Sequence, residues 1–467
     1  MERAVLEPGD KRTGVFIHAE DERAPCVVGA LWVDEERGVL AEIPYIAQAG
    51  DQFATPTRWF GLGLDRTPRN LVFRSEDLSV SLFECRTIST VTGSHLDIGR
   101  LRVKEAVFAE QLDDIDDPLR VTKLVSHIDG LGGWSNLTSV KQEFEPIGSR
   151  HHRAGTRVRY TIESAQGFSW LQGAARMRLV TDWRDGGSDD PGIHLIDDTV
   201  VESRFKEPRP VADHLAEHRK FRDLFSLIIG TGAYFRGHTV RDRRLGVMTF
   251  DQKVKGAPYQ PLLAAGTVAE HYRPRPDRNE ENWPMLAIVD LTPQALTWWA
   301  QKYNSSQRFV LPTTAALRRT RGYSEDRIIN AAMSIEAIGP VLGPVQGEGP
   351  TLARKKPTIA THFLRALENV EVDPTPLATS TVDLARALAD TYNTVKHADR
   401  GDFPDGLVQY YAGRLSLVLS RMAILGRLPG AGGSVKRYAK SDQVERLFEG
   451  MKVDGIRVKA GEFSTTP

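Results

Sequence analysis

Apolar residues change their spacing along this chain of 467 residues, and that change limits the possible folds more than any other feature. Before about residue 205, apolar and polar residues alternate in several segments, which is typical of β-strands with one buried face. Helical spacing appears at 211–229 and dominates from residue 293 onward. We therefore expect an α+β protein in which a large β-rich N-terminal domain precedes an all-α helical bundle.

The strand signal is clearest in four segments of the N-terminal region. Residues 27–33 form a continuous apolar run, as in a buried strand. The segments that alternate with period two are 78–84, 156–162 and 175–180. Further strands are predicted at 244–250 and 285–291, on either side of a polar loop at 273–282. Gly, Asp and Pro cluster between the runs as turns require, so a twisted sheet, a sandwich or an open barrel fits the pattern.

Helix start and end signals organise the C-terminal region. Thr292 followed by Pro293 is typical of a helix start, and Ser324 with the two acidic residues after it indicates another. The second helix is expected to run to about residue 339. The later helices are predicted at 358–370, 381–399 and 405–426. A basic, Gly-rich tail follows from residue 430, with one short amphipathic segment near 443–451.

These patterns place the domain boundary near residue 292, with a β-rich domain over 1–292 and a helical domain over 293–467. The chain has 61 basic and 61 acidic residues, so its net charge gives no general attraction to nucleic acid or membranes. Its two cysteines, Cys26 and Cys85, are too few for a disulfide framework or a Cys-rich zinc site. No apolar run approaches the roughly twenty residues that cross a bilayer. We expect a cytoplasmic protein without a membrane partner.

The helix predicted at 381–399 carries the most informative polar residues. Four of them are spaced by four, three and four: Arg386, Asp390, Asn393 and His397. At 100° per residue these side chains fall within about 60° of one another and form one stripe. A solvated face would more often consist of Glu, Lys and Gln. The alternative is an exposed polar face whose C-terminal histidine is favoured by the helix dipole.

A carboxylate interrupts the apolar side of the helix that begins at Ser324. Glu336 shares that side with Ile329, Ala332 and Met333. Burial of an unpaired carboxylate is costly, so Glu336 is expected to have a partner, which the polar stripe could supply. The alternative is a partly exposed Glu336 at the edge of the stripe.

The segment Tyr392-Asn393-Thr394-Val395-Lys396-His397, followed by 398–401, resembles the signature of HEPN domains. These are small helical bundles, many of them ribonucleases, and their motif joins an Arg, often followed by Asn, to a His a few residues later. Asn393 and His397 match, and Tyr392 stands at the Arg position. Residues 331–338 resemble the preceding helix of the family, which often carries a Glu where Glu336 lies. Residues 218–227 are similar to a segment of ApeA-like proteins, which join a large β-rich domain to a C-terminal HEPN domain and act in anti-phage defence.

The resemblance implies metal-independent RNA cleavage without a cofactor, in which a ribose 2′-hydroxyl attacks the neighbouring phosphate. His397 would be the general acid or base, and Asn393 would position it or the phosphate, with Glu336 completing the site. Arginine normally holds the phosphate bidentately, and Tyr392 lacks that charge. The residues then expected to contact RNA are Lys396, Arg400, Arg386 and Tyr392.

The resemblance also implies a homodimer whose active site takes one motif from each chain, and a phage-derived trigger at the regulatory N-terminal domain. Two alternatives remain open. The first is a catalytically inactive HEPN protein that acts as a binding or dimerisation module. The second is a binding protein whose β domain recognises a ligand unrelated to RNA. Elsewhere, His214 and His218 lie four apart on a predicted helix, but no third metal ligand stands on their face.

Overall fold

The computed structural model divides the chain into two compact units. Its described residues are 6–19, 24–47, 53–61, 67–109, 118–147, 155–185, 195–245, 258–275, 284–319, 322–375, 377–397, 399–400 and 402–465. The N-terminal unit comprises Met1–Ser169, Ala174–His218 and Tyr234–Pro274. The C-terminal unit comprises Trp170–Gly173, Arg219–Ala233 and Arg275–Pro467. Helix α3 (Val211–Ile229) therefore contributes residues to both units.

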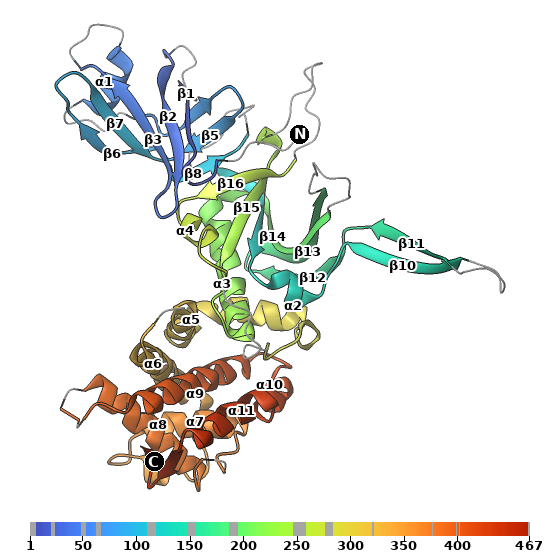
Figure 1. The fold of residues 1–467 in the computed structure, drawn as a ribbon, viewed down its shortest axis with the longest axis vertical. Helices are drawn as coiled ribbons and strands as arrows, with labels where there is room; N and C mark the ends of the chain where they lie inside the picture. Colours follow the sequence, from blue (N-terminus) through green and yellow to red (C-terminus); the bar gives the residue numbers. More distant parts are fainter. Residues whose placement is uncertain are drawn as a thin grey trace. The chain divides into compact units, whose positions relative to one another are not determined.

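One large sheet forms the N-terminal unit. Its fourteen described strands follow the order β12-β13-β14-β9-β15-β16-β8-β5-β4-β1-β2-β3-β7-β6, and the described registers are antiparallel (Figure 1). Their bounds are β1 (Lys11–His18), β2 (Val27–Asp34), β3 (Gly38–Tyr45), β4 (Leu71–Arg74), β5 (Ser79–Phe83), β6 (Arg86–Val91), β7 (Asp97–Arg102), β8 (Glu105–Val107), β9 (Arg120–Ile128), β12 (Gln166–Gln172), β13 (Ala175–Asp185), β14 (Leu195–Pro210), β15 (Phe235–Arg241) and β16 (Gln260–Ala264). Three short helices accompany the strands: α1 (Ala54–Phe60), α2 (Leu131–Ser135) and α4 (Val268–His271).

The four clearest predicted strands of this unit are confirmed. The apolar run at 27–33 lies in β2, and the alternating segments at 78–84 and 175–180 lie in β5 and β13. Their apolar side chains build a core in which the rings of Phe16 and Phe73 pack with centroids 5.0 Å apart. The alternation of apolar and polar residues thus gives each of these strands a face that is buried in the core, as the sequence indicates.

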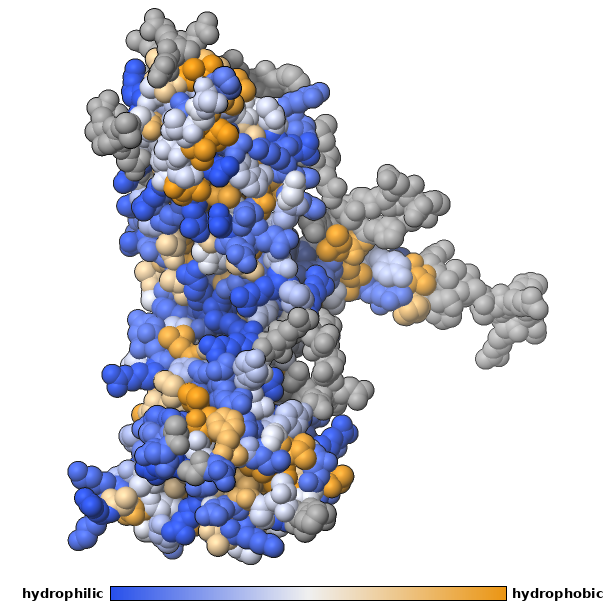
Figure 2. Space-filling model, turned by 60° about the vertical axis from the view of Figure 1, so that its left-hand side comes forward, coloured by the Kyte–Doolittle hydropathy of each residue, from blue (hydrophilic) through white to orange (hydrophobic). Residues whose placement is uncertain are grey.

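A separate two-stranded hairpin, β10 (Val140–Ile147) and β11 (Gly155–Ile162), projects from the sheet (Figure 1) and contains the strand predicted at 156–162. Phe144 faces Val158 across the hairpin, and Tyr160 follows two residues later on the same face. Phe144 and Tyr160 are 64% and 61% exposed, and Figure 2 shows hydrophobic patches on this arm. The hairpin therefore presents apolar side chains to solvent.

Two histidines of α3 are buried in the N-terminal unit. The His214 ring lies within hydrogen-bonding distance of the Ser203 hydroxyl and of the Val121 carbonyl, at 2.7 and 3.0 Å. The Nδ1 atom of His218 lies 2.7 Å from the Ser126 hydroxyl. Burial lowers the pKa of His214 to about 4, so the ring is neutral at neutral pH. Both side chains are part of the core, and no group of three His, Cys, Asp or Glu residues suited to a metal occurs in the described ranges.

Helices make up most of the C-terminal unit, as predicted. Their bounds are α5 (Pro293–Arg318), α6 (Ser324–Leu342), α7 (Ile359–Val370), α8 (Thr381–Lys396), α9 (Gly406–Leu425), α10 (Gly432–Ala439) and α11 (Asp442–Val453). Helix α6 packs against α5, α7 and α9, and α8 packs against α7 (Figure 1). Thr292 accepts a hydrogen bond from the Ala295 amide at 3.1 Å and Pro293 begins α5, which confirms that helix start.

Several sequence predictions are corrected. Residues 288–290 form a 3₁₀ helix, η3 (Ile288–Asp290), where a strand over 285–291 was expected. At 243–245 a 3₁₀ helix, η2 (Arg243–Leu245), replaces the start of the strand predicted at 244–250, whose remainder lies outside the described residues. The Gly-rich tail contains α10 and a hairpin formed by β17 (Ile456–Lys459) and β18 (Glu462–Thr465), which the sequence patterns did not indicate. Of the described helices, none combines the length and the apolar character that a membrane crossing requires.

A buried carboxylate holds several parts of the C-terminal unit together. Asp223 on α3 is 2% exposed and accepts a hydrogen bond from the Tyr303 hydroxyl at 2.5 Å. It also pairs with Arg222 at 3.2 Å and with Arg318 at the end of α5. The nearby Arg421 of α9 donates to the carbonyl of Leu227 at 2.8 Å, near the end of α3. These contacts join α3, α5 and α9.

The start of α8 provides a first prediction. The Ser380 hydroxyl accepts a hydrogen bond from the Asp383 amide at 3.1 Å and so caps the helix. We expect Ser380→Ala to lower the free energy of unfolding by about 1 kcal/mol, because the amide loses its partner. Urea denaturation followed by tryptophan fluorescence measures the effect. Ser380→Thr retains the hydroxyl and serves as the control, and equal losses in both variants would contradict the capping role.

Candidate functional site

Helix α8 carries most of the residues expected at the site. Leu384 and Leu388 are buried on its inner side, whereas Arg386 and Asp390 are exposed and Asn393 is half-buried. The alternation of buried and exposed positions follows the helical period, as the sequence predicts. The stripe as far as Asn393 therefore lies on the outer side of the helix.

His397 does not continue this helix. Helix α8 ends at Lys396, and His397 has extended dihedral angles, φ −121° and ψ 109°. Its backbone amide donates to the Asn393 carbonyl at 2.9 Å, and the Arg400 amide donates to its own carbonyl at 3.1 Å. The prediction of a helix over 381–399 is therefore too long by three residues, and helical spacing does not determine the direction of the His397 side chain. A tight turn instead places Arg400 beside the half-buried His397.

Arg386 contacts the segment before α7 and the turn between β17 and β18. Its guanidinium donates to the Pro350 carbonyl at 2.5 Å, and its side chain packs at Gly461 in the turn between β17 and β18. Asp390 lies in the field of both Glu462 and Arg400: burial and Glu462 raise the pKa of its carboxyl, and Arg400 lowers it. The charge of Arg400 thus acts on Asp390, and its backbone is bonded to that of His397.

Tyr392, at the position of the motif's usual Arg, is 3% exposed. Lys396 donates to its hydroxyl at 2.8 Å and also lies over its ring, 5.0 Å from the centroid. The hydrogen bond to Tyr392 raises the pKa of Lys396, and Glu336 contributes to the same shift. Tyr392, Lys396 and Glu336 therefore form one group.

Glu336 is exposed, so the alternative of an exposed carboxylate is the one observed, and burial of this carboxylate is not. The physical reason is that the buried face of α6 is shifted by one residue from the face that the sequence predicted. Ile328, Ala331 and Ile335 face the core, and Met333 is 47% exposed. Among the described residues, no hydrogen bond or ion pair joins Glu336 to Asn393 or His397.

Two residues of α7 belong to the same region and were not predicted. His362 is 8% exposed, and its Nδ1 atom has no hydrogen-bond partner in the described part of the chain. Burial lowers the pKa of His362, Arg365 lowers it further, and Glu336 raises it. Its ring packs directly on Gly339 of α6, where a Cβ atom would approach Nδ1 to 2.3 Å. The spacing of His362 and Arg365, three apart on one helix, is the sequence signal that would have revealed them.

A buried ion pair holds this part of α7 in place. Arg365 donates to both oxygens of Glu348 at 2.9 and 3.0 Å and to the Gly339 carbonyl at 3.3 Å. The forked pair lowers the pKa of Glu348 and fixes the loop that follows α6. Chemically, the region combines the buried imidazole of His362 with the cation Lys396, whereas the charge of Arg365 is neutralised by Glu348.

Comparison with known proteins identifies a family for the N-terminal half of the chain. A family model described as ApeA N-terminal domain 1 matches residues 11–244, just over half of the chain. No curated protein and no solved structure matches the chain. The matched residues cover most of the large sheet and all of α3, and the family indicates a role in anti-phage defence. The chain belongs to the ApeA N-terminal domain 1 family.

Proposed function

We propose that this protein is a HEPN-type ribonuclease effector of anti-phage defence, which acts in the cytoplasm by abortive infection. The N-terminal unit restrains the C-terminal unit until a phage-derived trigger binds, and the released helical unit then cleaves RNA. The observation that supports the nuclease most directly is Asn393 and His397 at the end of α8, with Arg400 in the turn beside them.

The proposed reaction requires no metal. His397 removes the proton from a ribose 2′-hydroxyl, and the 2′-oxygen forms a bond to the adjacent phosphorus. The bond from phosphorus to the 5′-oxygen breaks, and a protonated imidazole gives this oxygen its proton. The products are a 2′,3′-cyclic phosphate and a 5′-hydroxyl. Asn393 orients the phosphate, and Arg400 stabilises the charge that develops on it.

Two imidazoles serve this reaction better than one, because one accepts a proton while the other donates one. A homodimer through the C-terminal units, with both His397 side chains facing one cleft, supplies both. Sedimentation velocity should then show a dimer at micromolar concentration, and a strict monomer with and without RNA would contradict this arrangement.

The geometry of Tyr392 favours a second candidate function. Its side chain is buried and its hydroxyl is engaged by Lys396, so it supplies no guanidinium to a phosphate. A catalytically inactive HEPN domain would then act as a binding or dimerisation module and would use the same surface for RNA or protein.

Expression in a bacterial host separates the two functions. During infection by a phage that supplies the trigger, wild-type protein should fragment total cellular RNA, whereas the double variant Asn393→Ala/His397→Ala should leave the RNA intact at the same protein level. Intact RNA with both proteins, when a trigger phage is also present, would reject the nuclease and favour the binding module.

A further inference from the structure

Three consecutive basic residues, Arg354, Lys355 and Lys356, form a tight turn between η4 (Gly349–Thr351) and α7, and the sequence contains no other run of this kind. Ala353 and Lys356 exchange two backbone hydrogen bonds, both at 2.9 Å, so the two residues between them form the whole loop. All three basic side chains are exposed. This basic turn therefore presents three cations to solvent from one short loop.

The backbone of the basic turn is unusual for the residues that occupy it. Arg354 and Lys355 have φ values of +51° and +64°. Two-residue loops with a positive φ at both positions prefer Asn-Gly, Asp-Gly or Gly-Gly, because a long side chain makes this conformation costly. The protein places two long basic side chains where other residues would be more stable, and such a conflict is typical of a functional site.

The base of the basic turn is held by threonine hydroxyl groups. The Thr358 hydroxyl donates to the Thr351 carbonyl at 2.7 Å, and the Thr361 hydroxyl donates to the same carbonyl at 2.8 Å. Thr351 itself is 4% exposed. The turn thus projects from a fixed base at the start of α7, so its backbone requires little ordering when a ligand binds.

The three cations have no acidic partner among the described residues. The carboxylate that precedes the turn, Glu348, is engaged by Arg365 at 2.9 and 3.0 Å. Elsewhere in the same unit, exposed cations are paired: Lys436 and Lys440 both bind Glu371, at 2.6 and 3.2 Å. The charge of the basic turn is therefore not neutralised within the described part of the chain.

Arg386 of α8 contacts the segment that leads into the basic turn. Its guanidinium donates to the Pro350 carbonyl at 2.5 Å, and its side chain is exposed. Ten residues separate Arg386 from Lys396 at the end of α8, which corresponds to about 15 Å along the helix. Arg386 thus adds a fourth cation on the side of the basic turn, well separated from the end of α8.

The helical region as a whole is basic, although the chain is neutral. Residues 293–467 contain 23 basic and 17 acidic side chains, whereas residues 1–292 contain 38 basic and 44 acidic ones. A basic region attracts polyanions at long range, and exposed cations on a fixed loop hold phosphate groups at short range. Both conditions are met at the basic turn.

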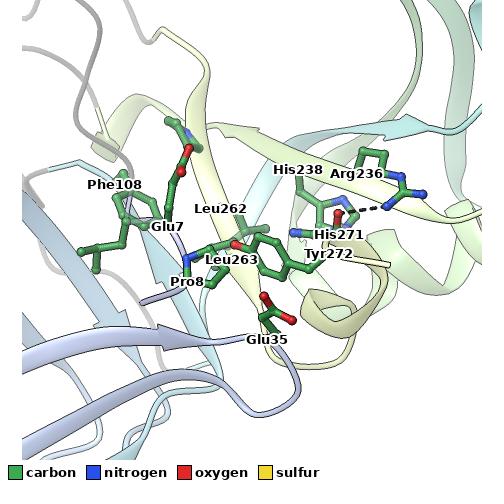
Figure 3. A pocket seen from close by; sticks show the side chains of 13 residues that line it. Glu7, Pro8, Glu35, Phe108, Arg236, His238, Leu262, Leu263, His271 and Tyr272 are labelled. Atoms are coloured by element: carbon green, nitrogen blue, oxygen red, sulfur yellow. Dashed lines mark hydrogen bonds between the residues drawn. The ribbon is translucent and has the colours of Figure 1, made fainter. Parts of the chain in front are cut away.

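The cavity of the N-terminal unit, with a volume of about 510 Å³, lacks this chemistry (Figure 3). Its lining includes Arg236, which donates to Asp129 through two nitrogen atoms and to the His271 carbonyl at 3.0 Å, the bond drawn as a dashed line. Glu7 and Glu35 also line the cavity. Because its arginine is engaged by protein acceptors and two carboxylates stand beside it, the cavity does not suit a polyanion.

We propose that the basic turn and Arg386 bind the phosphate backbone of RNA, on a surface separate from the end of α8 that carries His397. The inference rests on the proposed function, because it names where the helical unit holds its substrate. Phosphate contacts position a strand and carry no sequence information. This surface therefore raises the affinity for RNA of any sequence and extends the bound strand beyond the site of cleavage.

Fluorescence anisotropy with a labelled single-stranded RNA of about 12 nucleotides tests this surface. The parent protein is the full-length chain with His397→Ala, so the RNA stays intact, and the exposed turn requires no trigger to bind it. Arg354→Gln/Lys355→Gln/Lys356→Gln should weaken RNA binding at least about tenfold in about 0.1 M salt. The slope of log affinity against log salt should fall by about 2, because three phosphate contacts are lost.

A matched variant separates the basic turn from net charge. Lys436→Gln/Arg437→Gln/Lys440→Gln removes the same number of charges from the same unit, at positions that are paired with carboxylates. It should leave the RNA affinity within about twofold of the parent protein, because paired cations attract a phosphate less.

A second variant separates binding from folding. Arg354→Asn/Lys355→Gly introduces the pair of residues that this backbone prefers. We expect its Tm to equal or exceed that of the parent protein, while its RNA affinity falls severalfold. Binding as tight as that of the parent protein would contradict a role of these two side chains in holding RNA.

Equal affinity of the parent protein and the triple turn variant would overturn the proposal, as would equal losses in the turn variant and the matched variant, or no RNA binding by the parent protein. Vesicles that contain phosphatidylserine offer a different anionic surface. If the turn is required for vesicle binding and not for RNA binding, the assignment to RNA is wrong. Fragmentation of RNA during infection, which tests the nuclease, is a separate readout, so the two proposals can fail independently.

Discussion

Replacement of His397 by alanine is expected to slow RNA cleavage by the triggered full-length protein by about a hundredfold or more, because a positioned general acid or base contributes this much to a rate. His397 lies in a turn at the end of α8 and is half-buried, so its removal leaves the packing of the helix unchanged. Cleavage of end-labelled RNA, followed over time, measures the effect.

Two comparisons make the test specific. His95→Ala removes an exposed histidine of the N-terminal unit and should leave the rate unchanged. Arg400→Gln should slow cleavage more than Lys396→Gln, because Arg400 lies in the same turn as His397 whereas Lys396 is held by Tyr392. Full activity of His397→Ala would remove His397 from the mechanism.

Asp223→Ala is expected to lower the free energy of unfolding of the C-terminal unit by about 3–5 kcal/mol. The substitution leaves two guanidinium groups without their carboxylate, one of them on the largely buried Arg222, and deprives the Tyr303 hydroxyl of its acceptor. Asp223 is 2% exposed, and burial and Asp223 together raise the pKa of Tyr303.

The matched control is an exposed pair in the same unit. Asp326 binds Arg319 at 2.9 Å, and their side chains are 45% and 52% exposed. Asp326→Ala should therefore cost less than about 1 kcal/mol. Urea denaturation of both variants measures the difference, and equal losses would show that the Asp223 cluster contributes no more than a surface ion pair.

Much of the architecture follows from the spacing of apolar residues. The alternation of apolar and polar residues predicted β5, β11 and β13. The helical spacing, followed by Gly230, predicted α3 with the bounds that the structure shows. Gly230 has a φ of +77°, and a Cβ atom there would meet the Arg421 guanidinium at 2.6 Å, so both the turn and the packing require glycine. Local signals of this kind act within a few residues and are visible in the sequence.

The candidate site was predicted less well, for two physical reasons. The helical period fixes a buried face only to within about one residue, which is why Glu336 was expected inside and lies outside. Helix ends depend on caps, and α8 stops at Lys396, which takes His397 out of the predicted stripe. The motif names the residues of the proposed site, but it does not predict the directions of their side chains.

Contacts between distant segments were beyond local patterns. His362 and Arg365 lie near Glu336 only because α7 packs against α6, and the Arg365–Glu348 pair joins a helix to a preceding loop. The Asp223 cluster likewise joins α3 to Tyr303 and Arg318, which lie up to about a hundred residues further along the chain. Such pairs can be identified only when the three-dimensional structure is known.

The chemistry of the RNA ends tests the central claim most directly. Wild-type protein that has been released by its trigger should cleave RNA in the presence of EDTA, and the products should carry 2′,3′-cyclic phosphate and 5′-hydroxyl ends, because the attacking group is the ribose hydroxyl. Mass spectrometry of the fragments identifies these ends. Products with 5′-phosphate and 3′-hydroxyl ends, or cleavage that stops in EDTA, would contradict a metal-independent mechanism built on His397.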